Sequence, residues 1–216
     1  MLEELKCKVF YANQDLFDMS VCHFPWISVS AIDRKSGLVI FMPDGGALTE
    51  EDMAVVDLSG CVVEGKEPPV CDTAVHLKLY QEFPEIGSIA HPYSQWATVF
   101  SQLDLSIPVL GTIHAETFGD DIPTTGQMQP EVLCDPNGAA VAEAICAAFR
   151  ALGRTPAEIP AVLTTCQGAY TFGEDSRMAV NNAAILNETA FLAYHTMQLD
   201  PGIRPMQLRR MPCRGK

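Results

Sequence analysis

The sequence lacks a long apolar run and is poor in basic residues. No segment approaches the roughly 18 consecutive apolar residues that indicate a transmembrane helix. The first residues mix charges into a helical pattern, where a signal peptide would have an apolar stretch. Lys and Arg number 14 against 27 Asp and Glu, giving a net charge of −13; this argues against a nucleic-acid surface, because phosphates demand clustered basic side chains. We therefore expect a cytoplasmic protein whose partners include neither nucleic acid nor a membrane.

The sequence also lacks any C-x-x-C pair. Its eight cysteines are scattered, which favours small buried hydrophobic side chains in a reducing compartment over a disulfide framework or a zinc knuckle. With 216 residues, 48% of them hydrophobic and 19% charged, the chain suits a single globular domain. We predict that this domain spans residues 1–200 and that residues 201–216 form a basic, proline-interrupted tail.

Helical and strand patterns alternate along the chain. Apolar spacing predicts helices over residues 2–17, 73–83, 94–103, 137–152 and 176–199, the fourth capped by Asp135 or Asn137. Thr49 and Asp52 form a capping-box-like pattern at a short helical turn. Alternating patterns predict hairpins that turn at Ser36-Gly37, Ser59-Gly60 and Gln167-Gly168, a buried strand over 86–91, and strand and loop over 107–119. This order of elements favours an α/β fold of the α+β type or a three-layer α/β/α domain.

A series of motifs follows these elements in order. They are W-x-S-V-S-A-I-D, P-x-G, L-T-x-x-D-M-x-V-V, V-V-E-G, D-T-x-x-H-x-x-x-Y, F-P-x-I-G-S-I-x-H, S-I-P-x-x-G-T-x-H-A and Q-G-A-Y-T-F-G. From residue 1 to about residue 199, their order and spacing resemble the class II aldolase and adducin family, and within it the L-ribulose-5-phosphate 4-epimerase branch.

The resemblance implies a fold, an assembly and a chemistry. It implies a central, mostly antiparallel sheet flanked by helices, and a homotetramer with active sites between subunits. It further implies metal-assisted retro-aldol cleavage of a carbon–carbon bond in a sugar phosphate, followed in the epimerase by re-formation of the bond with inversion at C4. A divalent cation would stabilise the enediolate as a Lewis acid, and three imidazoles would suit zinc.

Two of the three metal positions implied by the resemblance carry weaker donors. His91 occupies the first position, at the end of a predicted strand, while Tyr93 and Gln167 stand at the other two. A neutral amide is a poor zinc ligand, and a phenol must lose a proton of pKa about 10 to become a good one. We therefore expect a divalent metal to bind weakly or not at all. His114 could substitute as a ligand, or could be a satisfied core histidine.

Two carboxylates match the acidic positions of the family. Asp72 corresponds to the residue beside the metal, and Glu116 to the catalytic carboxylate, which would remain competent as a general acid or base. Tyr93 could serve as an acid in a metal-independent variant of the site. His76 and Tyr80 lie one helical turn apart and are interpreted as helix-packing residues.

The positions that resemble the family's phosphate pocket are also altered. Candidate substrate-binding residues are Ser28, Asp44, Gly45, Cys71 and Thr112. Gly45 and Thr112 are retained from the family pattern, whereas Met42 and Asp44 replace a Lys and a Ser. Losing a cation and adding a carboxylate disfavours an anionic phosphate electrostatically.

Three functions remain open at this point. The first is a family-like enzyme acting on a sugar or small hydroxy-carbonyl compound, either a carbohydrate epimerase or an aldehyde-lyase. It would use a metal site rebuilt from Asp72, His91 and Glu116, with His114 as a further candidate ligand. The second is a non-catalytic relative with a regulatory or binding role, which has lost zinc and phosphate binding. The third is a metal-independent enzyme that uses Glu116 as base and Tyr93 as acid.

Overall fold

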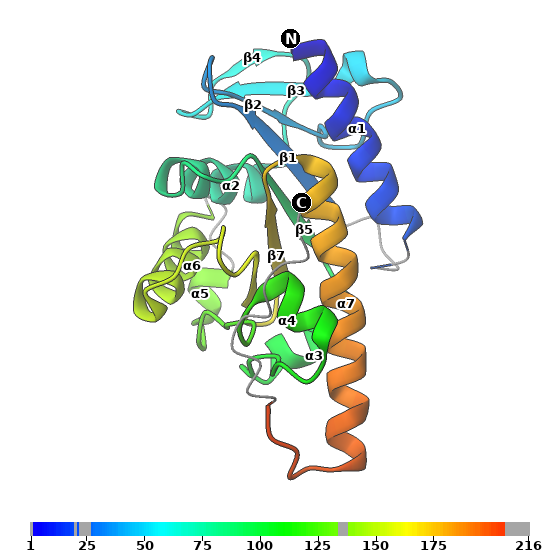
Figure 1. Cartoon of the computed structure of the whole chain (residues 1–216). Coiled ribbons are helices and arrows are strands. Elements are labelled where there is room, and N and C mark those ends of the chain that lie inside the picture. Colours follow the sequence, from blue (N-terminus) through cyan, green and yellow to red (C-terminus); the bar gives the residue numbers. More distant parts are fainter. Residues whose placement is uncertain (1, 20, 22–26, 134–137, 206–216) are drawn as a thin grey trace.

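A seven-stranded antiparallel sheet forms the centre of the molecule (Figure 1). The computed structural model describes residues 2–19, 21, 27–133 and 138–205. The strand order is β4-β3-β2-β1-β5-β7-β6, and every neighbouring pair is antiparallel. The strands are β1 (Ile27–Asp33), β2 (Leu38–Phe41), β3 (Ala54–Asp57), β4 (Val62–Glu64), β5 (Ser88–Pro92), β6 (Ala161–Thr164) and β7 (Gly168–Gly173).

Helices cover both faces of this sheet. One face carries α1 (Leu2–Asp18), α3 (Gln95–Gln102), α4 (Thr112–Phe118) and α7 (Ser176–Leu199). The other carries α2 (Val70–Glu82) and α6 (Ala139–Leu152), with the short α5 (Pro130–Leu133) beside α6 (Figure 1). A single 3₁₀ turn, η1, spans Glu50–Asp52 within the described residues. The three-layer α/β/α architecture is therefore confirmed, and its sheet is antiparallel throughout.

Period-two alternation in the strands creates a separate core on each face. On the α2 and α6 side, Phe41 and Phe172 pack with Leu79 and Phe149. On the opposite side, small sheet residues such as Val29 and Ala90 accommodate helices α1 and α7. Both faces are buried, and the central strands are mostly apolar on both sides, so register shifts are strongly opposed.

The predicted hairpin turns are present. Gly37 connects β1 to β2 with a φ of 71°, and Gly60 connects β3 to β4 with a φ of 89°, conformations that glycine adopts at low cost. The Asp33 carboxylate accepts a hydrogen bond from the Ser36 hydroxyl at 2.6 Å and so closes the first turn. The Asp52 carboxylate likewise accepts from the Thr49 backbone N–H at 3.2 Å, as the capping pattern predicted.

The prediction of strand and loop over residues 107–119 is wrong for its second half. Residues Thr112–Phe118 form the helix α4, which begins after Gly111 and ends at Gly119 in the left-handed conformation (φ 73°). The β-branched Thr112 and Ile113 favour a strand locally, but burial of Phe118 among side chains of the sheet and α7 outweighs this preference. Tertiary packing thus overrides local propensity at this segment.

The start of helix α6 and the end of helix α7 can be compared with the sequence predictions. Helix α6 begins at Ala139, and its predicted caps Asp135 and Asn137 lie outside the described residues. Helix α7 ends at Leu199, near the predicted start of the tail, most of which also lies outside the described residues. Across the described part of the chain, none of the helices is both long and apolar enough to cross a membrane.

Candidate active site

The candidate site lies where β1 begins and β5 ends, on the side of the sheet that α2 covers. Ser28 and His91 stand opposite each other in the register of these two strands. Side chains alternate between the two faces along β5, so His91 lies on the same face of the sheet as Ile89, which packs in the α2 core. Asp72 projects from the first turn of α2 toward the same point. Residues distant in sequence are thereby brought together by a strand pair and a helix start.

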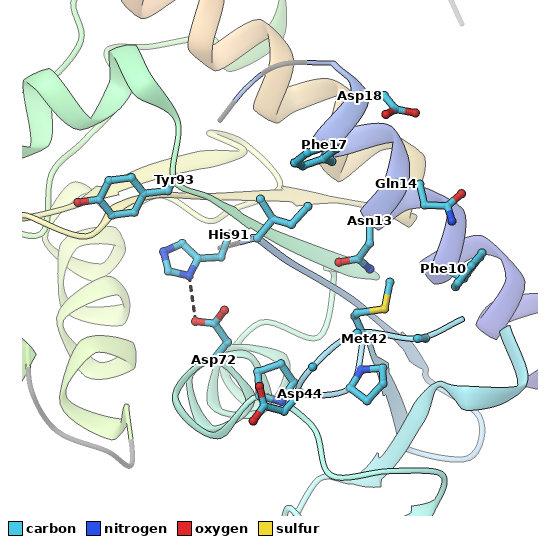
Figure 2. A pocket seen from close by; sticks show the side chains of 16 residues that line it. Phe10, Asn13, Gln14, Phe17, Asp18, Met42, Asp44, Asp72, His91 and Tyr93 are labelled. Atoms are coloured by element: carbon cyan, nitrogen blue, oxygen red, sulfur yellow. Dashed lines mark hydrogen bonds and ion pairs between the residues drawn. The ribbon is translucent and has the colours of Figure 1, made fainter. Parts of the chain in front are cut away.

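Both ring nitrogens of His91 are hydrogen-bonded to oxygen atoms. Its Nδ1 lies 2.9 Å from Asp72 Oδ1, and its Nε2 lies 3.1 Å from the backbone carbonyl oxygen of Gln167 (Figure 2). The imidazole stacks on Tyr170, with ring centroids 4.1 Å apart and planes 11° from parallel. Two oxygen acceptors and a stacked ring hold this histidine in one orientation, with both N–H groups as donors when it is protonated.

This geometry stabilises the ionised forms of both partners. Burial acts to raise the pKa of Asp72, but the His91 charge and the hydrogen bonds from His91 and Ser28 outweigh burial and lower it to about 2. Burial acts to lower the pKa of His91, but the Asp72 carboxylate and the Gln167 carbonyl raise it above its usual value. The pair is therefore an aspartate–imidazolium ion pair over the pH range between the two pKa values.

A second histidine, His76, lies one turn further along α2 than Asp72 and has different surroundings. The Ser30 hydroxyl lies 2.8 Å from both His76 Nδ1 and the Tyr80 hydroxyl, inside the α2 core. Burial lowers the pKa of His76 to about 4, so this ring is neutral at physiological pH. The structure thus places His76 and Tyr80 as buried packing residues, in agreement with the interpretation of their helical spacing.

A cavity of about 1090 Å³ opens beside the ion pair (Figure 2). Among the predicted site residues, Asp72, His91, Tyr93, Asp44 and Gly45 line it. Figure 2 shows the His91–Asp72 pair on one side and helix α1 on the other. Helix α1 and the strand ends contribute apolar lining residues that the sequence analysis did not identify as site residues: Phe10, Phe17 and Ile27. The signal available in the sequence was the seven-residue separation of Phe10 and Phe17, which places both on one face of a helix.

Other predicted site residues lie elsewhere or act differently. Thr112 and Glu116 are exposed on α4 and do not line the cavity. His114 is buried, and its Nε2 lies 3.0 Å from the Asp120 carbonyl oxygen. Gln167 meets His91 through its backbone carbonyl. The side chain of Cys71 lies outside the described residues.

Comparison with known proteins identifies the family. The sequence-family model of the class II aldolase and adducin N-terminal domain matches residues 7–194 of the chain. The chain belongs to the class II aldolase and adducin family. It is 38% identical over 209 residues to the L-ribulose-5-phosphate 4-epimerase UlaF of Salmonella paratyphi A, covering 95% of this chain and 90% of that protein. It is 37% identical to the corresponding protein of Salmonella paratyphi B, with the same coverage.

Solved structures of class II aldolases share the fold. An L-fuculose 1-phosphate aldolase superposes with a TM-score of 0.76 at 22% identity, covering 94% of this chain and 91% of that chain. The L-fuculose-1-phosphate aldolase of Thermus thermophilus superposes with a TM-score of 0.69 at 21% identity, covering 93% of this chain and 98% of that chain. The predicted class II aldolase-like fold is therefore confirmed, and the family relationship to epimerases and aldolases with it.

The zinc that this family implies does not fit the described donor set. The candidate ligand atom His91 Nε2 already points at a carbonyl oxygen, and Nδ1 is occupied by Asp72. Within the described residues, no group of three or more His, Cys, Asp or Glu side chains could hold a metal ion. Zinc sites of this kind need three protein ligands with free lone pairs and an open fourth position. Binding through His91 would require its Nε2 to leave Gln167.

Proposed function

We propose that the chain is an enzyme of the L-ribulose-5-phosphate 4-epimerase and class II aldolase type, acting on a hydroxy-carbonyl compound in the cavity beside His91. The observation that carries this proposal is the ion pair of Asp72 and His91 at the cavity wall, with Tyr93 nearby. A relative that is 38% identical over most of both chains supports the same chemistry. The reaction class is cleavage of a carbon–carbon bond adjacent to a hydroxyl group, by loss of the hydroxyl proton, with or without re-addition of the aldehyde.

The polar residues of the cavity have distinct roles in this proposal. Asp72, with a pKa of about 2, is a weak base and serves to orient and charge His91. The imidazolium places a positive charge where negative charge develops on the substrate during bond cleavage. The Tyr93 hydroxyl, which lies 3.4 Å from the Cys166 carbonyl oxygen, would act as the acid that transfers a proton to a substrate oxygen.

A neighbouring subunit would complete the site. Glu116 and Thr112 are exposed on α4, outside the cavity of their own chain. In the homotetramer that the family resemblance implies, these residues would face the cavity of an adjacent subunit. Glu116 would then act as the general base, since the Asp72 carboxylate beside the substrate is paired with His91. Any divalent cation would bind more weakly here than at a site of three imidazoles.

One observation favours a second candidate, a non-catalytic binding protein. Both nitrogens of His91 are satisfied within the protein, so the ring needs no ligand to complete its hydrogen bonds. A non-catalytic protein that uses the cavity to bind a regulatory ligand could have the same hydrogen bonds at His91.

Turnover of a defined compound separates the two candidates. We expect the purified chain to convert L-ribulose 5-phosphate or a non-phosphorylated hydroxy ketone, followed by NMR as inversion at C4 or as release of an aldehyde. Tyr93→Phe should lower kcat by about 100-fold because it removes a proton donor. Tyr11→Phe makes the same chemical change at an exposed tyrosine outside the cavity and should leave kcat unchanged. Absence of turnover for every compound would support the non-catalytic candidate.

A further inference from the structure

Acidic side chains outnumber basic ones in the described lining of the cavity. Its sixteen described lining residues include no Lys and no Arg, and their ionisable side chains other than Tyr93 are Asp18, Asp44, Asp72 and His91. Residues 22–26, which precede the lining residue Ile27, contain no Lys or Arg in the sequence either. Since His91 is paired with Asp72, the remaining carboxylates of Asp18 and Asp44 leave the cavity with an excess of negative charge. A phosphate dianion would lack the cationic partner that such groups usually find in proteins.

Two basic side chains on segments that flank the cavity lining are already engaged in ion pairs. Lys6 is buried on α1, with its Nζ 2.6 Å from Glu64 Oε1. Lys66 lies 3.6 Å from an Asp52 carboxylate oxygen. Neither belongs to the cavity lining, so recruiting either one to a phosphate would break an existing ion pair.

One wall of the cavity carries several apolar side chains. Phe10 and Phe17 from α1 line it together with Ile27 and Met42 from the strand ends. Phe17 is 50% exposed although it is aromatic, so a ligand could bury much of its ring. Figure 2 shows Phe10, Phe17 and Met42 across the cavity from the His91–Asp72 pair.

Helix α1 also adds three polar residues to the lining, Asn13, Gln14 and Asp18, and the Asn13 side chain is occupied by hydrogen bonds to the backbone. The Asn13 side-chain amide donates to the carbonyl oxygens of Val9 and Val29 at 2.8 and 3.3 Å, and its oxygen accepts from the Val29 N–H at 3.0 Å. This amide therefore has little capacity left for a ligand. The cavity consequently has two unlike sides, one with the charged pair and one where apolar side chains lie beside Gln14 and Asp18.

We infer that the cavity binds a non-phosphorylated hydroxy-carbonyl compound that carries an apolar substituent. The hydroxy-carbonyl end lies against His91, Asp72 and Tyr93, and the substituent lies between Phe17 and Met42. This inference rests on the proposed function, since it names the substrate class of the same site. Few convergent polar groups opposite an apolar wall are typical of sites that bind such amphipathic small molecules.

Isothermal titration calorimetry on the full chain tests the inference with two probes, 4-hydroxy-4-phenylbutan-2-one and L-ribulose 5-phosphate. We expect the phenyl ketone to bind more tightly. Phe17→Ser should raise the Kd of the phenyl ketone by about 10-fold, because it removes an aromatic contact surface. Met19→Ser changes a residue of similar exposure at the end of α1, outside the cavity, and should alter that Kd by less than about 2-fold.

A charge exchange gives the reciprocal test. The double substitution Met42→Lys and Asp44→Ser adds a cation and removes a carboxylate, and should tighten L-ribulose 5-phosphate binding by about 10-fold while weakening that of the phenyl ketone. Tighter binding of the phosphorylated sugar to the unsubstituted chain, no binding of the phenyl ketone, or no effect of Phe17→Ser would overturn the inference. If the inference fails in this way, turnover of the phosphorylated sugar would still support the proposed function. Binding of the phenyl ketone without turnover of any compound would overturn the proposed function but not the inference about the ligand.

Discussion

Replacing Asp72 with Asn tests the ion pair at the centre of the site. The substitution keeps the shape of the side chain and removes the charge that faces His91 Nδ1 at 2.9 Å. Folding lowers the pKa of Asp72 from 3.8 to about 2, and at about 1.4 kcal/mol per pKa unit this corresponds to roughly 2 kcal/mol of stabilisation. Both side chains are mostly buried, with 17% and 22% of their surfaces exposed, so solvent screens this interaction only in part.

The effect depends on pH in a defined direction. The folded-state pKa of Asp72 is lowered, so its contribution is present above about pH 3.8 and is lost as pH falls through about 2. The folded-state pKa of His91 is raised, so its contribution is complete below pH 6.5 and is lost as pH rises through the folded value. The free energy of unfolding should therefore differ most between the unsubstituted chain and Asp72→Asn in the range between those limits.

Urea denaturation at pH 5.5 and pH 9, with NMR titration of the His91 ring, measures both consequences. At pH 5.5, Asp72→Asn should lower the free energy of unfolding by about 2 kcal/mol. The pKa of His91 should also fall, because burial lowers this pKa and the Asp72 charge that raises it is gone. Asp44→Asn removes an exposed carboxylate in the same cavity and should change stability by less than about 0.5 kcal/mol. An unchanged or higher His91 pKa in Asp72→Asn would refute the reasoning.

Three further substitutions test the packing that supports the site, each by chemical denaturation at fixed protein concentration. Asn13→Ala should cost about 2 kcal/mol, because it removes the hydrogen bonds that tie α1 to Val29 in β1; a cost near zero would show that water replaces them. Gly65→Ala should destabilise by more than about 1 kcal/mol, since an added Cβ would lie 2.2 Å from the Met53 carbonyl oxygen at a φ of 83°. Phe118→Ala should cost about 3–5 kcal/mol by leaving a cavity between α4 and α7; a loss below about 1 kcal/mol would contradict the packing that explains α4.

Local patterns in the sequence were sufficient for most of the fold. The helices at both ends, α1 and α7, have long amphipathic repeats, and the hairpin turns carry glycines at positions that need a positive φ. These signals depend on residues adjacent in sequence, so they can be interpreted without knowledge of the partner surfaces. Helix α4 could not be predicted in this way, because its β-branched residues favour a strand and only burial of Phe118 selects the helix.

Some residues of the site could likewise be identified from the sequence, whereas others could not. The motifs identify His91 and Asp72, and strand alternation explains why His91 and Ser28 share a face. The sequence could not show that Gln167 meets His91 through its backbone carbonyl, because that contact depends on how β7 begins after the turn. Nor could it show that Phe10 and Phe17 line the cavity, since the position of α1 over the strand ends is set by long-range packing.

The sequence by itself thus determined the family, the layered fold, the acidic character of the chain and the replacement of two histidines by Tyr93 and Gln167. Tertiary structure decided what surrounds those positions. The one remaining histidine of the three is hydrogen-bonded at both ring nitrogens, and it lies across the cavity from aromatic side chains of the first helix. The physical reason is that residue types record which donors and charges are available, whereas direction and proximity arise from packing between segments far apart in sequence.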